Sequence, residues 1–152
     1  MKMNPLPKAP LEATTPSKPE AFFGKIPLLG WAIAYALQDQ RFHPIENAYK
    51  QLLTSRDRDE ALAQWSPEQR SDAARMMSIL KEELGWKSPA FIPTDPCLVA
   101  FWAHEDGLDD VAAIRQIEHE WGIEFSDEEI AKLQDYDLQA FIALIKTKAN
   151  KP

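Results

Sequence analysis

Apolar residues in the second half of the chain recur at three- and four-residue steps, the spacing of one face of an α-helix. The clearest stripe consists of Ala73, Met76, Met77, Leu80 and Leu84. Ser66 and Gln69 are spaced as a capping box, and Pro67 between them suits a first helical position. Gly85 follows where a left-handed C-cap is expected. The pattern therefore predicts a long helix over 66–84.

Three further helices are predicted toward the C-terminus. One covers 108–121 and ends at Gly122, and its expected buried stripe is Leu108, Val111, Ile114, Ile117 and Trp121. Ser126 opens a second capping box, for a short helix through Leu133. Asp137 is placed to cap the last helix, whose expected buried stripe is Leu138, Phe141, Ile142 and Ile145.

The segment 86–105 contains Pro89, Pro93 and Pro96 and cannot form one regular element. We expect a long loop there, with a short apolar turn near 98–102. No stretch of the chain alternates convincingly with period two, and no Asn-Gly hairpin signal occurs. The sequence therefore predicts an all-α protein.

The first 65 residues divide into a tail and a helical extension. Residues 1–20 are rich in proline, threonine, serine and lysine, so they bury little apolar surface and are expected to be a disordered tail. Residues 21–65 form the extension, with helices predicted over 45–53 and 58–65.

The apolar segment 21–37 has two interpretations. Its uninterrupted run after Pro27 is shorter than the ~20 residues of a membrane span. It is either a helix that docks on the rest of the protein, or an interfacial anchor or partner-binding helix. A membrane contact would be made by Phe22, Phe23, Leu28, Leu29 and Trp31.

The net charge and the cysteine content limit the kinds of partner and the cellular compartment that the chain would suit. The formal net charge of −7, without a concentrated basic patch, argues against nucleic-acid binding and favours partners with basic surfaces. Cys97 is the only cysteine, which excludes an internal disulfide and suits a reducing cytoplasm. Because it lies in an apolar run, we expect Cys97 to be a small buried hydrophobe.

Motifs for catalysis or metal binding are not evident. The five glycines form no phosphate loop, and no Gly-x-Ser-x-Gly turn occurs. His104, Asp106, Asp109 and His119 do not have the i,i+4 spacing of a helical ligand pair. The prediction is a non-enzymatic protein without a metal site.

Two runs of residues resemble acyl carrier proteins. The first is Asp106-Gly107-Leu108-Asp109-Asp110-Val111, and the second, 117–130, reads Ile-Glu-His-Glu-Trp-Gly-Ile-Glu-Phe-Ser-Asp-Glu-Glu-Ile. Upstream, 79–85 is similar to the end of the family's first helix. The resemblance covers 66–149 and implies a four-helix acyl-carrier-like bundle, behind the helical extension and the tail.

One residue departs from the carrier pattern. Carriers attach a phosphopantetheine arm to the serine of an Asp-Ser-Leu element, and this chain has Gly107 at that position. Glycine offers no hydroxyl, so the resemblance implies a degenerate carrier that holds no cofactor. A functional acyl or peptidyl carrier modified at an unrecognised serine is the alternative.

The acidic second helix is the expected partner site. Residues 105–137 include twelve acidic side chains against Arg115 and Lys132. This surface is either a solvated acidic face or a docking site for a protein with a basic surface. The residues proposed for docking are Asp106, Asp109, Asp110, Glu118 and Glu120.

Together these observations predict a cytoplasmic interaction module. If the carrier-like fold is right, Trp86, Trp102 and Trp121 would converge at one end of the bundle and fill its interior, the alternative being an apolar ligand cavity. A different alternative for the whole protein is a peripheral membrane protein anchored by 22–37.

Overall fold

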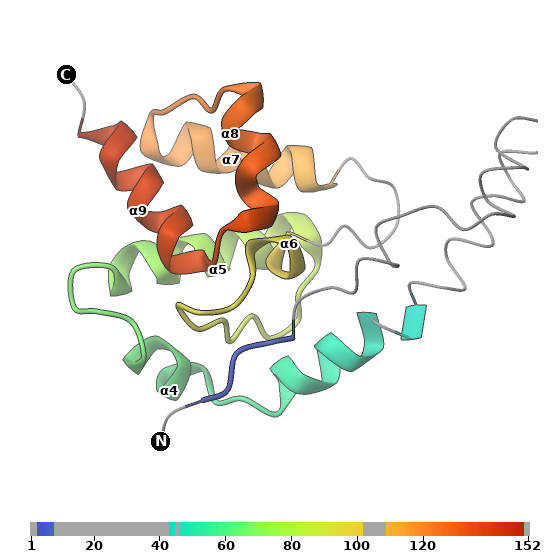
Figure 1. The fold of residues 1–152 in the computed structure, drawn as a ribbon. Coiled ribbons are helices and arrows are strands. Elements are labelled where there is room, and N and C mark those ends of the chain that lie inside the picture. Colours follow the sequence, from blue (N-terminus) through green and yellow to red (C-terminus); the bar gives the residue numbers. More distant parts are fainter. Residues whose placement is uncertain (1–2, 8–42, 45, 102–108, 151–152) are drawn as a thin grey trace, which may run out of the picture. The chain divides into compact units, whose positions relative to one another are not determined.

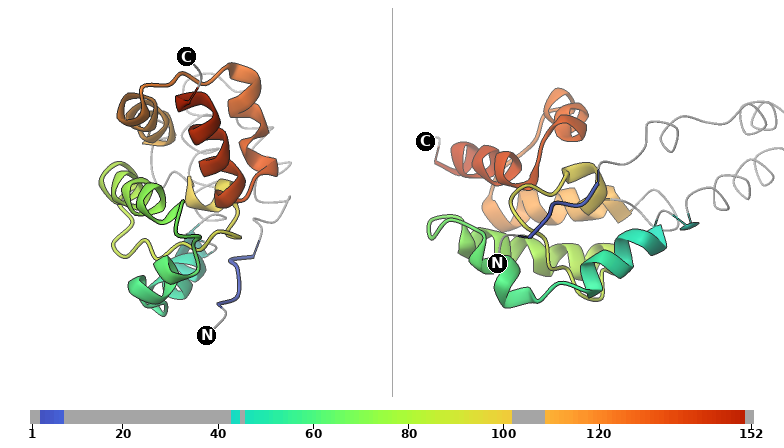
Figure 2. Two further views of the ribbon diagram at one scale, coloured as in Figure 1. Left: turned by 90° about the vertical axis from the view of Figure 1, so that its left-hand side faces the viewer. Right: turned by 60° about the horizontal axis from the view of Figure 1, so that its bottom comes forward.

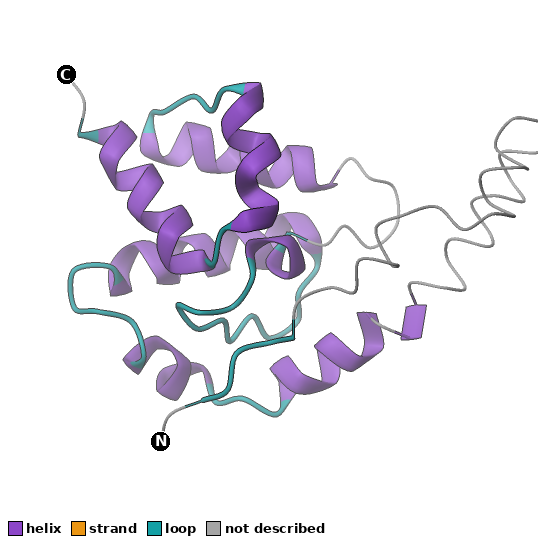
Figure 3. Cartoon of the chain, viewed as in Figure 1, coloured by secondary structure: helices purple, strands orange, loops and turns teal. Residues whose placement is uncertain are grey.

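The computed structural model describes residues 3–7, 43–44, 46–101 and 109–150. These residues form helices joined by loops and contain no β-strand, in agreement with the predicted all-α class (Figure 3). After a helix through 46–54, the elements are α4 (Arg58–Ala63), α5 (Arg70–Leu84), α6 (Cys97–Ala100), α7 (Asp109–Trp121), α8 (Asp127–Ala131), the 3-10 helix η1 (Lys132–Asp135) and α9 (Leu138–Ala149).

The chain divides into two compact units. One comprises Met1–Lys8 together with Leu52–Pro152, and the other is Ala9–Gln51, of which the described residues are helical. The first unit thus begins before Ser66, where the carrier-like domain was predicted to start. It also includes residues 3–7, which pack on the unit although they fall within the predicted disordered tail. The apolar segment 21–37 lies outside the described residues.

Helices α5 and α7 are an antiparallel pair and lie side by side in both views of Figure 2. The start of α5 meets the end of α7, where the Trp121 indole N–H donates to Asp72 at 3.2 Å. All five residues of the predicted α5 stripe are buried, and Gly85 ends the helix with a φ of 69°. The predicted helix start is wrong by several residues: 67–69 form a turn, and Gln69 makes no side-chain cap bond.

The predicted stripe of α7 is confirmed only in part. Ile114 and Ile117 are buried, but Val111 is 47% exposed. A helix position is buried only where another element covers it, and Val111 borders a hollow that the described side chains leave unfilled. The helix ends as predicted, at Gly122 with a φ of 62°.

The first N–H groups of α9 are accepted by its capping residue and by backbone carbonyls of the long loop. The first residues of a helix leave N–H groups without intrahelical partners. Asp137 accepts the N–H of Ala140 at 2.8 Å, as its capping role predicts. The carbonyls of Asp95 and Pro93 accept the N–H groups of Leu138 and Gln139, both at 2.9 Å. The long loop is therefore fixed to the start of α9 (Figure 1).

The tryptophans do not converge at one end of the bundle. Trp86 is buried just beyond the end of α5 and donates to the Ala100 carbonyl at 2.9 Å. Trp121 contacts Asp72 at the opposite end of α5. At 1.5 Å per residue, the two ends of this helix are about 20 Å apart. Trp102 lies outside the described residues.

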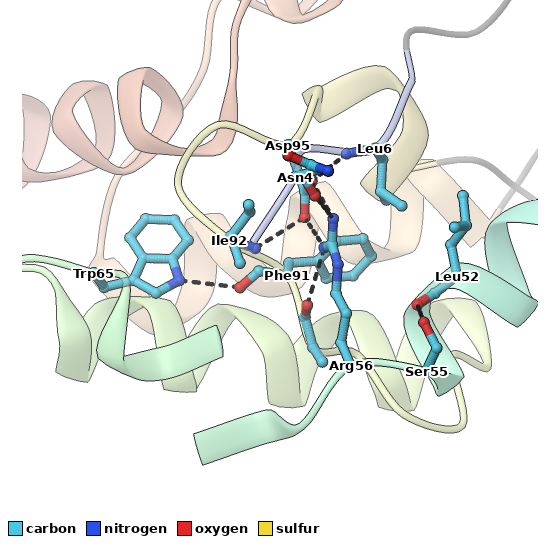
Figure 4. Close-up of polar contacts among 10 residues, drawn as sticks. Asn4, Leu6, Leu52, Ser55, Arg56, Trp65, Phe91, Ile92 and Asp95 are labelled. Carbon is cyan, nitrogen blue, oxygen red and sulfur yellow. Dashed lines mark hydrogen bonds and ion pairs between the residues drawn. The ribbon is translucent and has the colours of Figure 1, made fainter. Parts of the chain in front are cut away.

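A buried ion pair joins the long loop to the start of the unit. Asp95 is fully buried, and its carboxylate pairs with both terminal nitrogens of Arg56 at 2.6 and 3.1 Å (Figure 4). The same carboxylate accepts the backbone N–H of Ile92 at 2.9 Å and that of Leu6 at 2.7 Å. Each charge is thus compensated, as burial of a charge requires.

Removing one partner of this pair should strongly destabilise the unit. Asp95→Ala leaves the Arg56 guanidinium buried without its counter-ion, so we expect a loss of about 3–5 kcal/mol in the free energy of unfolding. Lys132→Ala is the matched control, because it breaks the exposed Lys132–Glu128 pair and should cost less than about 1 kcal/mol. Urea unfolding followed by tryptophan fluorescence measures both, and equal losses would contradict the structural role assigned to Asp95.

Candidate functional site

A hollow of about 510 Å³ lies between α6, α7 and the α8–η1 segment. Its size is within the range of small-molecule and side-chain pockets. The apolar residues that line it are Cys97, Leu98, Phe101, Val111, Ile114, Phe125, Ile130, Ala131 and Leu133.

Two large apolar side chains at this hollow are exposed to solvent. Val111 of α7 is 47% exposed, and Ile130 of α8 is 41% exposed. Scattered exposed apolar residues are ordinary, but two beside one apolar hollow form a patch that a partner could cover. The prediction had placed Val111 in the core. Ile130 was not singled out, and none of the five residues of α8 is buried.

Four charged side chains complete the lining. They are Arg115, Glu118, Glu124 and Asp127, and Arg115, Glu124 and Asp127 are exposed. Glu118 is half-buried and accepts the backbone N–H of Phe125 at 2.7 Å. Its carboxylate therefore fixes the segment between α7 and α8 that forms one wall of the hollow.

Cys97 is the one thiol of the chain and also lines the hollow. Burial raises the pKa of its thiol above the usual range, and the nearby negative charge of Asp137 raises it further. The sulfur donates weakly to the Asp137 carbonyl at 3.4 Å. The prediction of a small buried hydrophobe is confirmed, and a thiol in this state is a poor nucleophile.

Of the residues predicted for docking, the structure places the side chains of Glu118 and Glu120 on different sides of α7. Asp109 and Asp110 form the first turn of α7, and Asp106 and Gly107 lie outside the described residues. Glu118 and Glu120 are two positions apart on α7, so they point to nearly opposite sides of the helix. Glu118 faces the hollow, whereas Glu120 faces α5. They do not form one acidic face.

Glu120 belongs to a cluster that clamps α5 to α7. Arg75 donates through Nε to Glu120 at 2.9 Å, and its guanidinium lies over the Trp121 ring at 4.6 Å from the ring centroid. Stacking and pairing by one guanidinium is a common use of arginine. The Glu120 carboxylate is thus engaged within the fold.

The capping box at Ser126 is present as predicted and is tied to α9. Glu129 accepts the backbone N–H of Ser126 at 2.8 Å and pairs with Lys148 of α9 at 2.8 Å. The bond from Lys148, followed by the one from Ser126, holds the pKa of the Glu129 carboxyl below its usual value. This contact keeps α8, with Ile130, beside the hollow.

The described part of the chain contains neither a grouped metal site nor a membrane-spanning helix. No three side chains of histidine, cysteine, aspartate or glutamate are grouped as a metal site would need. No helix within the same residues is both long and apolar enough to cross a membrane. The residues of the predicted membrane contact, between Phe22 and Trp31, lie outside this part of the chain, as does His104.

Known proteins give no match to this chain, whether it is compared with protein-family models, with curated proteins or with solved structures.

The Glu129–Lys148 contact predicts a pH dependence. Because the folded pKa of Glu129 lies below its unfolded value, its stabilising contribution is complete above the unfolded pKa, and it is lost as pH falls through the folded pKa. An NMR titration should place the Glu129 midpoint below the usual value of a glutamate carboxyl, and Lys148→Met should raise it. A Glu129 midpoint unchanged by Lys148→Met would contradict the assigned cause.

Proposed function

We propose that this protein is a non-enzymatic interaction module, and that it binds a protein partner at the hollow between α6, α7 and α8. The observation that carries the proposal is the pairing of the apolar hollow with the exposed Val111 and Ile130 beside it. An apolar side chain of the partner would enter the hollow, and its neighbours would cover the two exposed residues. Interfaces draw most of their binding energy from such buried anchors.

The charges beside the hollow favour a partner with a basic surface. Glu124 and Asp127 are exposed there. Complementary charge speeds association and weakens with salt, while the apolar contact contributes most of the affinity. Arg115 would pair with a single acidic group of the partner.

The order of helices supports the resemblance to acyl carrier proteins. The 15-residue α5 is followed by a long loop, then α7, the short α8 and α9. On this proposal the four-helix carrier-like bundle is retained, the arm-bearing serine is replaced by Gly107, and the partner-binding surface remains in use. The raised pKa of the Cys97 thiol also favours binding over nucleophilic chemistry at the hollow.

Site-specific crosslinking tests the proposal. A photo-reactive residue in place of Ile130, introduced in the native cells, should capture a discrete protein. The same residue at Leu52, which is 44% exposed and does not line the hollow, is the matched control. Capture at both positions, or at neither, would contradict a binding surface at the hollow.

The affinity of the captured partner should then fall when Ile130 is substituted and stay the same when Leu52 is substituted. Ile130→Asp places a charge against the apolar anchor and should weaken binding at least tenfold by calorimetry, whereas Leu52→Asp should leave the dissociation constant unchanged. Raising the salt concentration should weaken the wild-type complex further. An Ile130→Asp affinity equal to that of wild type would contradict the proposed contact.

Intact mass separates this function from that of a working carrier. Protein purified from its native cells should have the mass of the bare polypeptide. A mass increased by a phosphopantetheine group would show that a serine elsewhere in the chain carries the arm, because residue 107 is a glycine. The chain would then be a carrier.

A further inference from the structure

Residues 3–7 lie on the unit as a separate extended piece. Their neighbours in sequence, from Ala9, belong to the other compact unit, and the unit on which they pack resumes at Leu52. Leu6 is nevertheless only 3% exposed, and Met3 packs against a small apolar cluster of Ala61, Ala90 and Ile92. The segment is therefore seated by its side chains at two positions, three residues apart.

The polar contacts of the segment with Arg56 and Asp95 use its backbone. The Leu6 N–H donates to Asp95 Oδ1 at 2.7 Å, and the Asn4 carbonyl accepts from Arg56 Nη2 at 2.6 Å (Figure 4). The side chains of Asn4, Pro5 and Pro7 are exposed. Arg56 and Asp95 thus recognise the Asn4 carbonyl and the Leu6 N–H, while Met3 and Leu6 supply the apolar contacts.

Two prolines favour the extended backbone that this contact requires. Pro5 and Pro7 have fixed φ angles, and a proline biases the residue before it toward extended backbone. Asn4 and Leu6, whose backbone groups are recognised, are the two residues before prolines. Little conformational entropy is then lost on docking, which is the advantage of proline-rich ligands.

The receiving groups are positioned without help from the segment. The Asp95 carboxylate accepts from Ile92 and from Arg56, and Arg56 also donates to the Ala90 carbonyl at 3.2 Å. These contacts lie within 56–95. The surface is thus a built site with one acceptor and one donor aimed at an extended chain.

We propose that the surface formed by Arg56, Asp95, Ala61, Ala90 and Ile92 is a binding site for an extended x-Pro-Leu-Pro peptide, and that Met3–Pro7 occupies it as a tethered, exchangeable ligand. The site is separate from the hollow and does not rest on the function proposed for it. Its specificity comes from an apolar residue between prolines whose N–H reaches Asp95.

A peptide supplied in solution tests the site in the full-length chain. Leu6→Asp should unseat the native segment without changing the receiving groups. A fluorescently labelled peptide of residues 1–8 should then bind Leu6→Asp saturably in an anisotropy titration, and at least tenfold more weakly to wild type, whose site is occupied. The same peptide with an N-methylated Leu6 lacks the N–H donor and should bind Leu6→Asp at least tenfold more weakly.

The outcomes are distinct. A folded Leu6→Asp chain that does not bind the peptide, or that binds the N-methylated peptide equally well, would overturn the proposal. If Leu6→Asp does not fold, amide exchange in the wild-type chain decides. If the Leu6 N–H exchanges through an opening whose free energy is lower than that of global unfolding, the segment is exchangeable. If the Leu6 N–H exchanges only through global unfolding, the segment is an integral part of the core and the proposal is overturned.

Discussion

The carboxylate of Asp95 is the constraint on which the arrangement of the unit depends. It lies in a loop that has little secondary structure of its own, yet it is fully buried and joins residues distant in sequence. Arg56, Ile92 and Leu6 all donate to it, and its own backbone carbonyl accepts the first N–H of α9. A buried charge needs compensating partners, and Arg56 and Ile92 supply them from within 56–95, so the loop has few other conformations open to it.

This constraint extends to the hollow. Pro96 and Cys97 follow Asp95 directly, and the Cys97 N–H donates to the Tyr136 carbonyl at 3.0 Å, which places α6 against the segment before α9. Phe101, at the end of α6, meets Phe141 of α9 edge to face with ring centroids 5.4 Å apart. One wall of the hollow is therefore set by the Asp95 loop, and the opposite wall by the Glu118 bond to Phe125 and the Glu129 contact with Lys148.

The features that could be predicted from the sequence are those fixed by neighbours along the chain. Gly85, the Ser126 capping box and the Asp137 cap act within a few residues, and the stripe of α5 follows from helix periodicity alone. The Arg56–Asp95 pair spans 39 residues and the Leu6–Asp95 bond 89, and nothing near Arg56 in the sequence distinguishes it from an ordinary surface arginine. Val111 fits the apolar period of α7 equally well whether or not an element covers it, so its exposure depends on how α6 and α8 pack. For the same reason the sequence offered an apolar cavity only as the alternative to a filled interior and did not give the residues that line the hollow.

The acidic region illustrates why counting charges is not enough to define a docking face. Residues 105–137 are strongly acidic, but the fold uses several of these carboxylates internally: Glu118 on a backbone N–H, Glu120 on Arg75 and Glu129 on Lys148. Glu124 and Asp127, in contrast, are exposed beside Val111 and Ile130. Carboxylates already engaged within the fold contribute less attraction to a partner than exposed ones, since their field is partly neutralised. Under the proposed function, electrostatic attraction should therefore be strongest next to the apolar hollow, where the exposed carboxylates of Glu124 and Asp127 lie beside the surface proposed to bind the partner.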